Sequence, residues 1–238
     1  MIELSATTPL APVEKRTLII AMTERSGSTN LCSVLAKLGM FGEPEEFFND
    51  QGMMQPLAEE LGAADGSDYL AKLAARSEIF CFKISRVHWR PFAHRAKTVF
   101  PDARYVFLDR LDLDAQAISL YRARTTWRWH AKAGDNGSDA TDVAFDPAEV
   151  EACRQHLREG RANWAKFFFE ADIKPLPIMY EHMIADMPKA VQMICGEAGV
   201  FVPQSQVPAG DYGVLRDELT EQWKETLRDL RAGKGLPA

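Results

Sequence analysis

The feature that most constrains the fold lies within residues 17–38, where a buried strand, a turn of small residues and an amphipathic helix are expected in succession. The strand is predicted by Leu18–Met22, an unbroken apolar run that suits a strand buried on both faces. The helix is predicted by apolar residues three and four positions apart, which are Leu31, Val34, Leu35 and Leu38. A strand that leads through a tight turn into a helix indicates an α/β protein.

The turn between this strand and this helix has the composition of a phosphate-binding loop. Arg25 supplies a positive charge, and Gly27 lets the backbone pass close to a ligand. Hydroxyl groups come from Ser26, Ser28 and Thr29, and the N–H groups at the start of the helix attract anions. The loop is not a Walker A loop, because Gly27 is followed directly by Ser28 and Thr29, with no lysine before the hydroxyl. The same residues suit an ordinary turn and helix cap, but the strand before and the helix after favour phosphate binding.

The rest of the chain is consistent with one α/β domain. Its 238 residues, 46% of them hydrophobic, can bury a sizeable core. Further strands are expected at residues 79–84, 104–110 and 177–180. Helices are expected in two short pieces within residues 53–77, from Asp112, from Asp146, after a turn at residues 181–188, and along a C-terminal stripe that includes Trp223.

Two predictions concern the ends of elements. Pro44, with acidic residues around it, predicts another helix N-terminus, where carboxylates interact well with the helix dipole. Residues 1–16 are expected to be a loose lead-in, and residues 17–238 a single domain.

The charge distribution points to a local anion pocket. The chain has a formal net charge of −6, which argues against a broad nucleic-acid-binding surface. Residues 104–132 instead carry six Lys or Arg against three Asp, a net charge of +3. Arg110 stands where a strand turns into a helix, so it is the strongest candidate for an anion ligand in this segment.

Cysteine usage and hydropathy exclude several classes of protein. The four cysteines are dispersed and form no C-x-x-C pair, which suggests neither a zinc site nor a disulfide framework. We therefore expect reduced thiols and a cytoplasmic location. The N-terminus lacks a signal-peptide pattern and no apolar run is long enough to span a bilayer, although peripheral contact with a membrane stays open.

An ordered set of motifs resembles the bacterial trehalose 2-sulfotransferase family from about residue 17 to residue 230. The set comprises Thr23–Thr29, Gly42–Phe48, Lys83, Asp109–Arg122, Trp129–His130 and Tyr180–Glu181. The resemblance implies a P-loop-like three-layer α/β fold with a mainly parallel central sheet flanked by helices. It also implies 3′-phosphoadenosine 5′-phosphosulfate (PAPS) as sulfuryl donor, a carbohydrate or glycolipid acceptor, no metal, and a homodimer.

The resemblance also implies roles for particular residues. The 5′-phosphosulfate would be held by Arg25, Ser26, Gly27, Ser28 and Thr29, and the 3′-phosphate by Arg110 and Ser119. Glu46 falls on the general base of the family. In-line sulfuryl transfer needs neutralised oxygens, so Arg25 and Lys83 could stabilise charge on the leaving oxygen while Glu46 takes the proton. His88 and His130 are the alternative bases.

Three positions depart from the family pattern, and two other functions remain open. Glu24 puts a negative charge beside a site for a polyanion, Asp109 stands where relatives often carry a basic residue, and Thr226 replaces an arginine. The first alternative function is a P-loop small-molecule kinase, because Tyr105–Asp109 resembles a strand that ends in a Walker B aspartate. The second is a non-catalytic nucleotide-binding protein that uses its C-terminal helix as an interaction surface.

Overall fold

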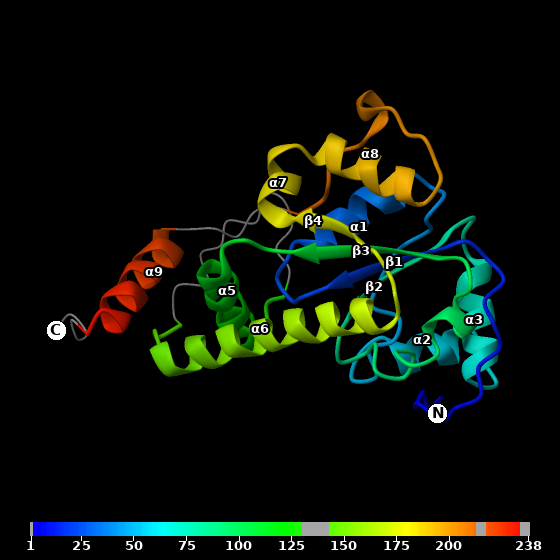
Figure 1. Ribbon diagram of the computed structural model, residues 1–238, viewed down its shortest axis with the longest axis horizontal. Coiled ribbons are helices and arrows are strands. Elements are labelled where there is room, and N and C mark those ends of the chain that lie inside the picture. The colour runs from blue at the N-terminus through cyan, green and yellow to red at the C-terminus, as the bar shows by residue number, and fades with distance from the viewer. Residues whose placement is uncertain (1, 130–142, 213–217, 234–238) are drawn as a thin grey trace.

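A computed structural model, which describes residues 2–129, 143–212 and 218–233, has a four-stranded sheet at its centre (Figure 1). The strands are β1 (Thr17–Met22), β2 (Phe80–Ser85), β3 (Ala103–Asp109) and β4 (Leu176–Met179). They run in the order β2-β1-β3-β4, and every pairing is parallel. The predicted parallel α/β sheet is therefore confirmed, and all four strands end at the same edge.

One face of the sheet is covered by α1 (Ser28–Lys37), α7 (Tyr180–Ala185) and α8 (Met187–Glu197) (Figure 1). Leu18 and Ile20 of β1 point into this layer and pack with α1 residues such as Leu31. The apolar spacing that predicted α1 is thus the face that the helix buries. A short 3₁₀ helix, Gln204–Gln206, follows α8.

The other face is covered by α2 (Met54–Glu60), α3 (Gly66–Ala75), α4 (Ala96–Val99) and the long helix α6 (Pro147–Glu170). Aromatic rings dominate this layer. Trp89 and Trp164 are fully buried, and their ring centroids lie 6.0 Å apart. Such rings contribute much of the buried apolar area of a core. Helices on both faces of the sheet confirm the three-layer architecture.

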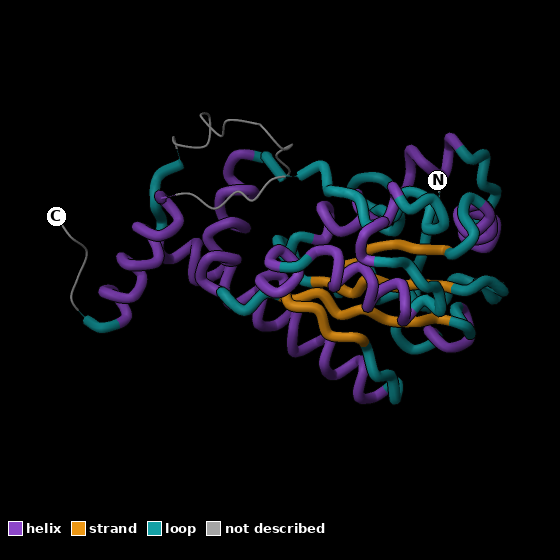
Figure 2. The backbone as a smooth tube through the Cα atoms, turned by 90° about the horizontal axis from the view of Figure 1, so that it is seen from above, coloured by secondary structure: helices purple, strands orange, loops and turns teal. Residues whose placement is uncertain are grey.

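Helices α5 (Leu113–Thr126) and α9 (Glu218–Arg231) extend the molecule beyond the sheet (Figures 1 and 2). Asp112 is the N-cap of α5 and accepts a hydrogen bond from the Ala115 N–H, as its position in the sequence predicted. Its other carboxylate oxygen lies 2.7 Å from Lys224 Nζ of α9. Trp223 and Leu227 of α9 pack against α5 and α6 in a separate apolar cluster.

Two of the predicted element boundaries were wrong. No helix begins at Pro44: residues 42–46 have no regular structure, because this segment runs beside β2, where the Lys83 N–H donates to the Glu45 carbonyl. Residues 181–185 are helical rather than a turn, because the helical turn buries Met183 in the cluster under α1.

The N-terminal segment and the cysteines complete the description of the core. Residues 2–16 contain no helix or strand, although Ile2 and Val13 are buried in the aromatic layer. All four cysteines are free and buried. No helix in the described part of the chain is both long and apolar enough to cross a membrane.

Candidate active site

A cavity of about 970 Å³ opens where the parallel strands end. Its walls come from the segments that follow β1, β2 and β3 and from α7, and they include Arg25, Glu46, His88, Arg110 and Ser119. In parallel sheets, ligands gather at the carboxyl ends of the strands, where chain connections diverge. The fold therefore brings together residues far apart in the sequence, such as Arg25 and Ser119, which are 94 positions apart.

The loop after β1 has a conformation suited to wrapping an anion. Arg25 and Gly27 both have positive φ angles, 61° and 83°. The Ser26 hydroxyl donates to the Thr23 carbonyl at 2.7 Å and is fully buried, so this hydroxyl shapes the loop rather than facing the cavity. Helix α1 has no side-chain cap, and Ser28 and Thr29 at its start line the cavity. The first N–H groups of α1 are thus available to a ligand.

Gly27 is required at its position for two separate reasons. Its φ of +83° strains any other residue, and an added Cβ would lie 2.7 Å from Cδ2 of Tyr180. We expect Gly27→Ala to lower the free energy of unfolding by about 1–3 kcal/mol, measured by urea denaturation. Gly39→Ala is the matched control, since Gly39 has the same φ and nothing within 4 Å of the added Cβ. An equal loss in both variants would contradict the steric part of this prediction.

The predicted donor contacts Arg25, Arg110 and Ser119 lie together. Arg25 Nε donates to the Ser119 hydroxyl at 2.9 Å, and Arg25 Nη1 donates to the Trp129 carbonyl. Arg110 Nη1 donates to the Arg25 carbonyl at 3.4 Å and its guanidinium lies 4.6 Å from the centre of the Tyr180 ring. Burial and the charge of Arg110 lower the pKa of Arg25 to about 10. The positive charges of Arg25 and Arg110 repel each other, and an anionic ligand would relieve this repulsion. The site therefore favours an anion.

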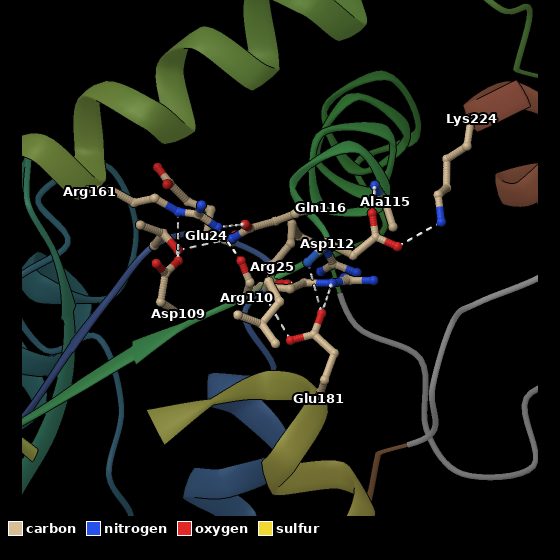
Figure 3. Close-up of polar contacts among 12 residues, drawn as sticks. Glu24, Arg25, Asp109, Arg110, Asp112, Ala115, Gln116, Arg161, Glu181 and Lys224 are labelled. Atoms are coloured by element: carbon tan, nitrogen blue, oxygen red, sulfur yellow. Dashed lines mark hydrogen bonds and ion pairs between the residues drawn. The ribbon is translucent and has the colours of Figure 1, made fainter. Parts of the chain in front are cut away.

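Glu181 fixes Arg110 at the junction of β3 and α5, a role that the sequence did not reveal (Figure 3). Its carboxylate accepts from the Leu111 and Asp112 N–H groups at 2.9 and 3.1 Å and lies 3.7 Å from Arg110 Nε. In the sequence, Tyr180–Glu181 was one of the motifs of the family resemblance and followed a predicted strand end, but no role was assigned to Glu181.

Both described candidates for the general base line the cavity. Glu46 is partly buried, and burial together with the charges of Glu45 and Glu24 raises its pKa against the opposing effect of Lys83. His88 Nδ1 lies 3.2 Å from the Ser85 hydroxyl, and burial lowers the pKa of His88. The third candidate, His130, lies outside the described residues.

Lys83 lies beneath the cavity rather than in its wall. Its side chain is 2% exposed, and its ammonium lies 3.1 Å from a carboxylate oxygen of Glu45 and donates to the Thr29 hydroxyl at 3.2 Å. Lys83 therefore reaches the cavity through Thr29 and, through Glu45, holds the segment that carries Glu46.

Two of the residues that depart from the family pattern, Asp109 and Glu24, contact side chains of α6, and Figure 3 shows the pair that Asp109 forms with Arg161. Asp109 accepts from the Thr23 hydroxyl at 3.2 Å and pairs with Arg161 at 2.8 Å. Glu24 accepts from His156 Nε2 at 2.9 Å. The carboxylate of Asp109 is thus paired with Arg161, whereas a Walker B aspartate would use its carboxylate to bind Mg²⁺. Within the described ranges, no three His, Cys, Asp or Glu side chains are grouped to hold a metal ion.

The comparison with protein families decides between the remaining classes. The model of the Stf0 sulphotransferase family matches residues 17–86 and 90–229. The chain belongs to this family. As an Stf0 sulphotransferase it is an enzyme that transfers sulfuryl groups. Membership of this family does not favour the kinase or the non-catalytic nucleotide-binding protein.

Two curated relatives agree with this membership. The chain is 23% identical over 267 residues to the trehalose 2-sulfotransferase of Mycobacterium tuberculosis strain Erdman, covering 93% of this chain and 98% of the relative. The trehalose 2-sulfotransferase of Mycolicibacterium smegmatis is 22% identical, with 92% and 97% covered.

Among solved structures, the sulfotransferase domain of the Synechococcus PCC 7002 olefin synthase superposes with a TM-score of 0.54 at 19% identity, covering 99% of this chain and 93% of that one. The sulfotransferase from Alicyclobacillus acidocaldarius gives 0.53 at 14% identity, with 95% and 98% covered. The predicted P-loop-like sulfotransferase fold is confirmed.

Proposed function

We propose that this Stf0 sulphotransferase transfers the sulfuryl group of PAPS to a hydroxyl of a carbohydrate or glycolipid. The observation that carries the proposal is the convergence of Arg25, Arg110, Ser119 and the uncapped start of α1 on one cavity that also contains Glu46. PAPS is phosphorylated at both ends, so it needs two anion-binding groups a nucleotide apart. The start of α1 would supply one of these groups, and Arg110 with Ser119 the other.

The residues divide between the two ends of the donor. The N–H groups and hydroxyls of Gly27, Ser28 and Thr29 would hold the 5′-phosphosulfate at the start of α1. Arg110 and Ser119 would hold the 3′-phosphate, and Arg25, which donates to Ser119, would join the two ends. Each contact replaces solvent around an oxygen that carries negative charge.

In the proposed sulfuryl transfer, each of these residues has one role. Glu46 takes the proton of the acceptor hydroxyl while that oxygen forms its bond to sulfur and the bond from sulfur to the phosphate oxygen breaks. Arg25 and the loop N–H groups stabilise charge that develops on the leaving oxygen, and buried Lys83 adds positive charge through Thr29. No covalent enzyme intermediate is needed, since positioning and charge stabilisation suffice for such transfers.

The relatives suggest the first acceptors to test. Because both curated relatives are named trehalose 2-sulfotransferase, trehalose is the first acceptor, followed by other neutral sugars and glycolipids. We also propose that the enzyme is a homodimer, which light scattering after gel filtration would measure.

A direct titration tests the donor. We expect calorimetry to show binding of adenosine 3′,5′-bisphosphate, the product left by PAPS, without added metal, and only weak binding of ATP with Mg²⁺. The reason is that Arg110 and Ser119 offer contacts for a 3′-phosphate, which ATP lacks. Tight Mg²⁺-dependent ATP binding with no affinity for the bisphosphate would overturn the proposed function in favour of a kinase.

A further inference from the structure

The charged residues in and around the cavity form a basic group near Arg25 and an acidic group near Glu46. Arg25 interacts electrostatically with Arg110 and Arg122, so positive charge surrounds the proposed donor contacts. Glu46 interacts instead with Lys83, Glu45 and Glu24. Glu24 and Glu46 both line the cavity, although the proposed donor is a polyanion. Because these two carboxylates would repel a polyanion, we expect them to contact a ligand other than the donor.

Glu24 is held in a fixed position on both its main chain and its side chain. Gln116, which is fully buried, donates from Nε2 to the Glu24 carbonyl at 2.7 Å. His156 of α6 binds Oε1 of the Glu24 carboxylate at 2.9 Å. Oε2 has no hydrogen-bond partner among the residues that the structure describes, and the side chain is 28% exposed. One oxygen therefore anchors the carboxylate, and Glu24 forms part of the cavity wall.

The surroundings keep Glu24 ionised. Burial alone would raise its pKa, but the hydrogen bond and charge of His156, together with Arg124, lower it. An ionised carboxylate only accepts hydrogen bonds, so it attracts hydroxyl and ammonium groups and repels carboxylates, phosphates and sulfates.

We propose that Glu24 is a specificity determinant that accepts a hydrogen bond from a second hydroxyl of the acceptor and excludes acceptors that carry an anionic group near the reacting hydroxyl. The inference rests on the proposed function and names its substrate class: neutral or amine-bearing polyols. Glu46 would take the proton of one hydroxyl and Glu24 would orient the next. The two carboxylates lie within electrostatic range of each other.

The experiment compares a neutral acceptor with its anionic analogue. With saturating PAPS, kcat/KM is measured for trehalose and for trehalose 6-phosphate. We expect the wild type to favour trehalose, and Glu24→Gln to reduce this preference about tenfold, because one like-charge repulsion is removed. A glutamine Oε1 still accepts from His156, so the anchoring contact survives. Affinity for adenosine 3′,5′-bisphosphate should not fall, because Glu24 does not serve the donor.

The matched control is Glu170→Gln, which removes a negative charge from the exposed C-terminal end of the same helix as His156 and leaves the cavity unaltered. Its preference should equal that of the wild type. A second measurement needs no variant: raising salt from about 0.05 M to about 0.5 M should weaken the preference of the wild type, since the cavity is open to screening ions.

The outcomes separate the two proposals. Transfer to trehalose with the same preference in Glu24→Gln and wild type, or a preference insensitive to salt, overturns the role of Glu24 and leaves the sulfotransferase proposal standing. Weakened bisphosphate binding in Glu24→Gln likewise overturns it, because Glu24 would then support the donor loop. Transfer to anionic sugars but to no neutral one also overturns the role of Glu24 alone, whereas no transfer to any sugar or glycolipid and no bisphosphate binding would overturn the proposed function as well.

Discussion

Replacing Glu46 with glutamine is expected to lower kcat for sulfuryl transfer by about 10²–10⁴-fold, because an amide cannot take the proton of the acceptor hydroxyl. The glutamine keeps the size of the side chain, and Glu46 makes no proposed contact with the donor. Affinity for adenosine 3′,5′-bisphosphate should therefore stay within about twofold of the wild type. Transfer of labelled sulfate to trehalose or another accepted sugar measures the first effect, and calorimetry measures the second.

Glu43→Gln is the control for this variant. Glu43 lies on the same irregular segment but is exposed and does not line the cavity, so its loss should leave kcat unchanged. If Glu46→Gln retains full activity, the base is elsewhere. His88, which lines the cavity, would be replaced next, and then His130.

The raised pKa of Glu46 adds a prediction about pH and stability. Burial lifts this pKa above its ordinary value of 4.5, so kcat/KM should rise with pH through that higher value as Glu46 loses its proton. Because the pKa of Glu46 is higher in the folded than in the unfolded state, its contribution to the free energy of unfolding is fully present below the unfolded pKa. This contribution is lost as the pH rises through the folded pKa. At neutral pH the ionised Glu46 thus costs stability, and Glu46→Gln should melt at the same temperature or higher.

Local sequence patterns predicted most of the fold. β1 and α1 were predicted because Leu18–Met22 and the stripe from Leu31 to Leu38 are buried as their spacing indicates. Asp112 and Asp146 were recognised as the starts of helices because their carboxylates accept from N–H groups two or three residues on. Such contacts lie within one turn of chain, so they are encoded locally.

The error at Pro44 shows where local patterns fail. Proline with acidic residues around it does favour a helix start, but the backbone of this segment pairs with β2 and Glu45 pairs with Lys83, 38 positions away. A short segment gains more from these long-range contacts than from one helical turn, because isolated helix nuclei are unfavourable. The same departure from helix lets Glu45 face Lys83 while Glu46 faces the cavity.

Glu24 is the clearest case of a residue that the sequence could not explain. Its partner, His156, lies 132 positions away on α6, and nothing in the spacing of the two residues predicts their contact. Asp109 at the end of β3 and Arg161 of α6 form a second such long-range pair. The three-dimensional packing of α6 against the end of β1, where Trp164 Nε1 donates to the Met22 carbonyl, brings both pairs together.

Replacing Arg25 with alanine is expected to weaken binding of adenosine 3′,5′-bisphosphate by about 100-fold, which corresponds to about 2.7 kcal/mol. Arg25 is partly buried at the centre of the donor contacts, between Ser119 and the Trp129 carbonyl. The unliganded protein should be affected little. The lost hydrogen bonds destabilise it by about 1 kcal/mol each, and the removal of repulsion from Arg110 offsets this loss. Calorimetry and thermal melting separate the two effects.

Arg25→Lys and Arg90→Ala refine this prediction. Lysine keeps the charge but lacks the planar fork that reaches Ser119, so affinity should fall by about tenfold rather than 100-fold. Arg90 is exposed and does not line the cavity, so its loss should leave affinity unchanged. Wild-type affinity in Arg25→Ala, with a large loss in Arg110→Ala, would assign donor binding to Arg110 alone. The positive φ of residue 25 would then serve only to turn the chain into α1.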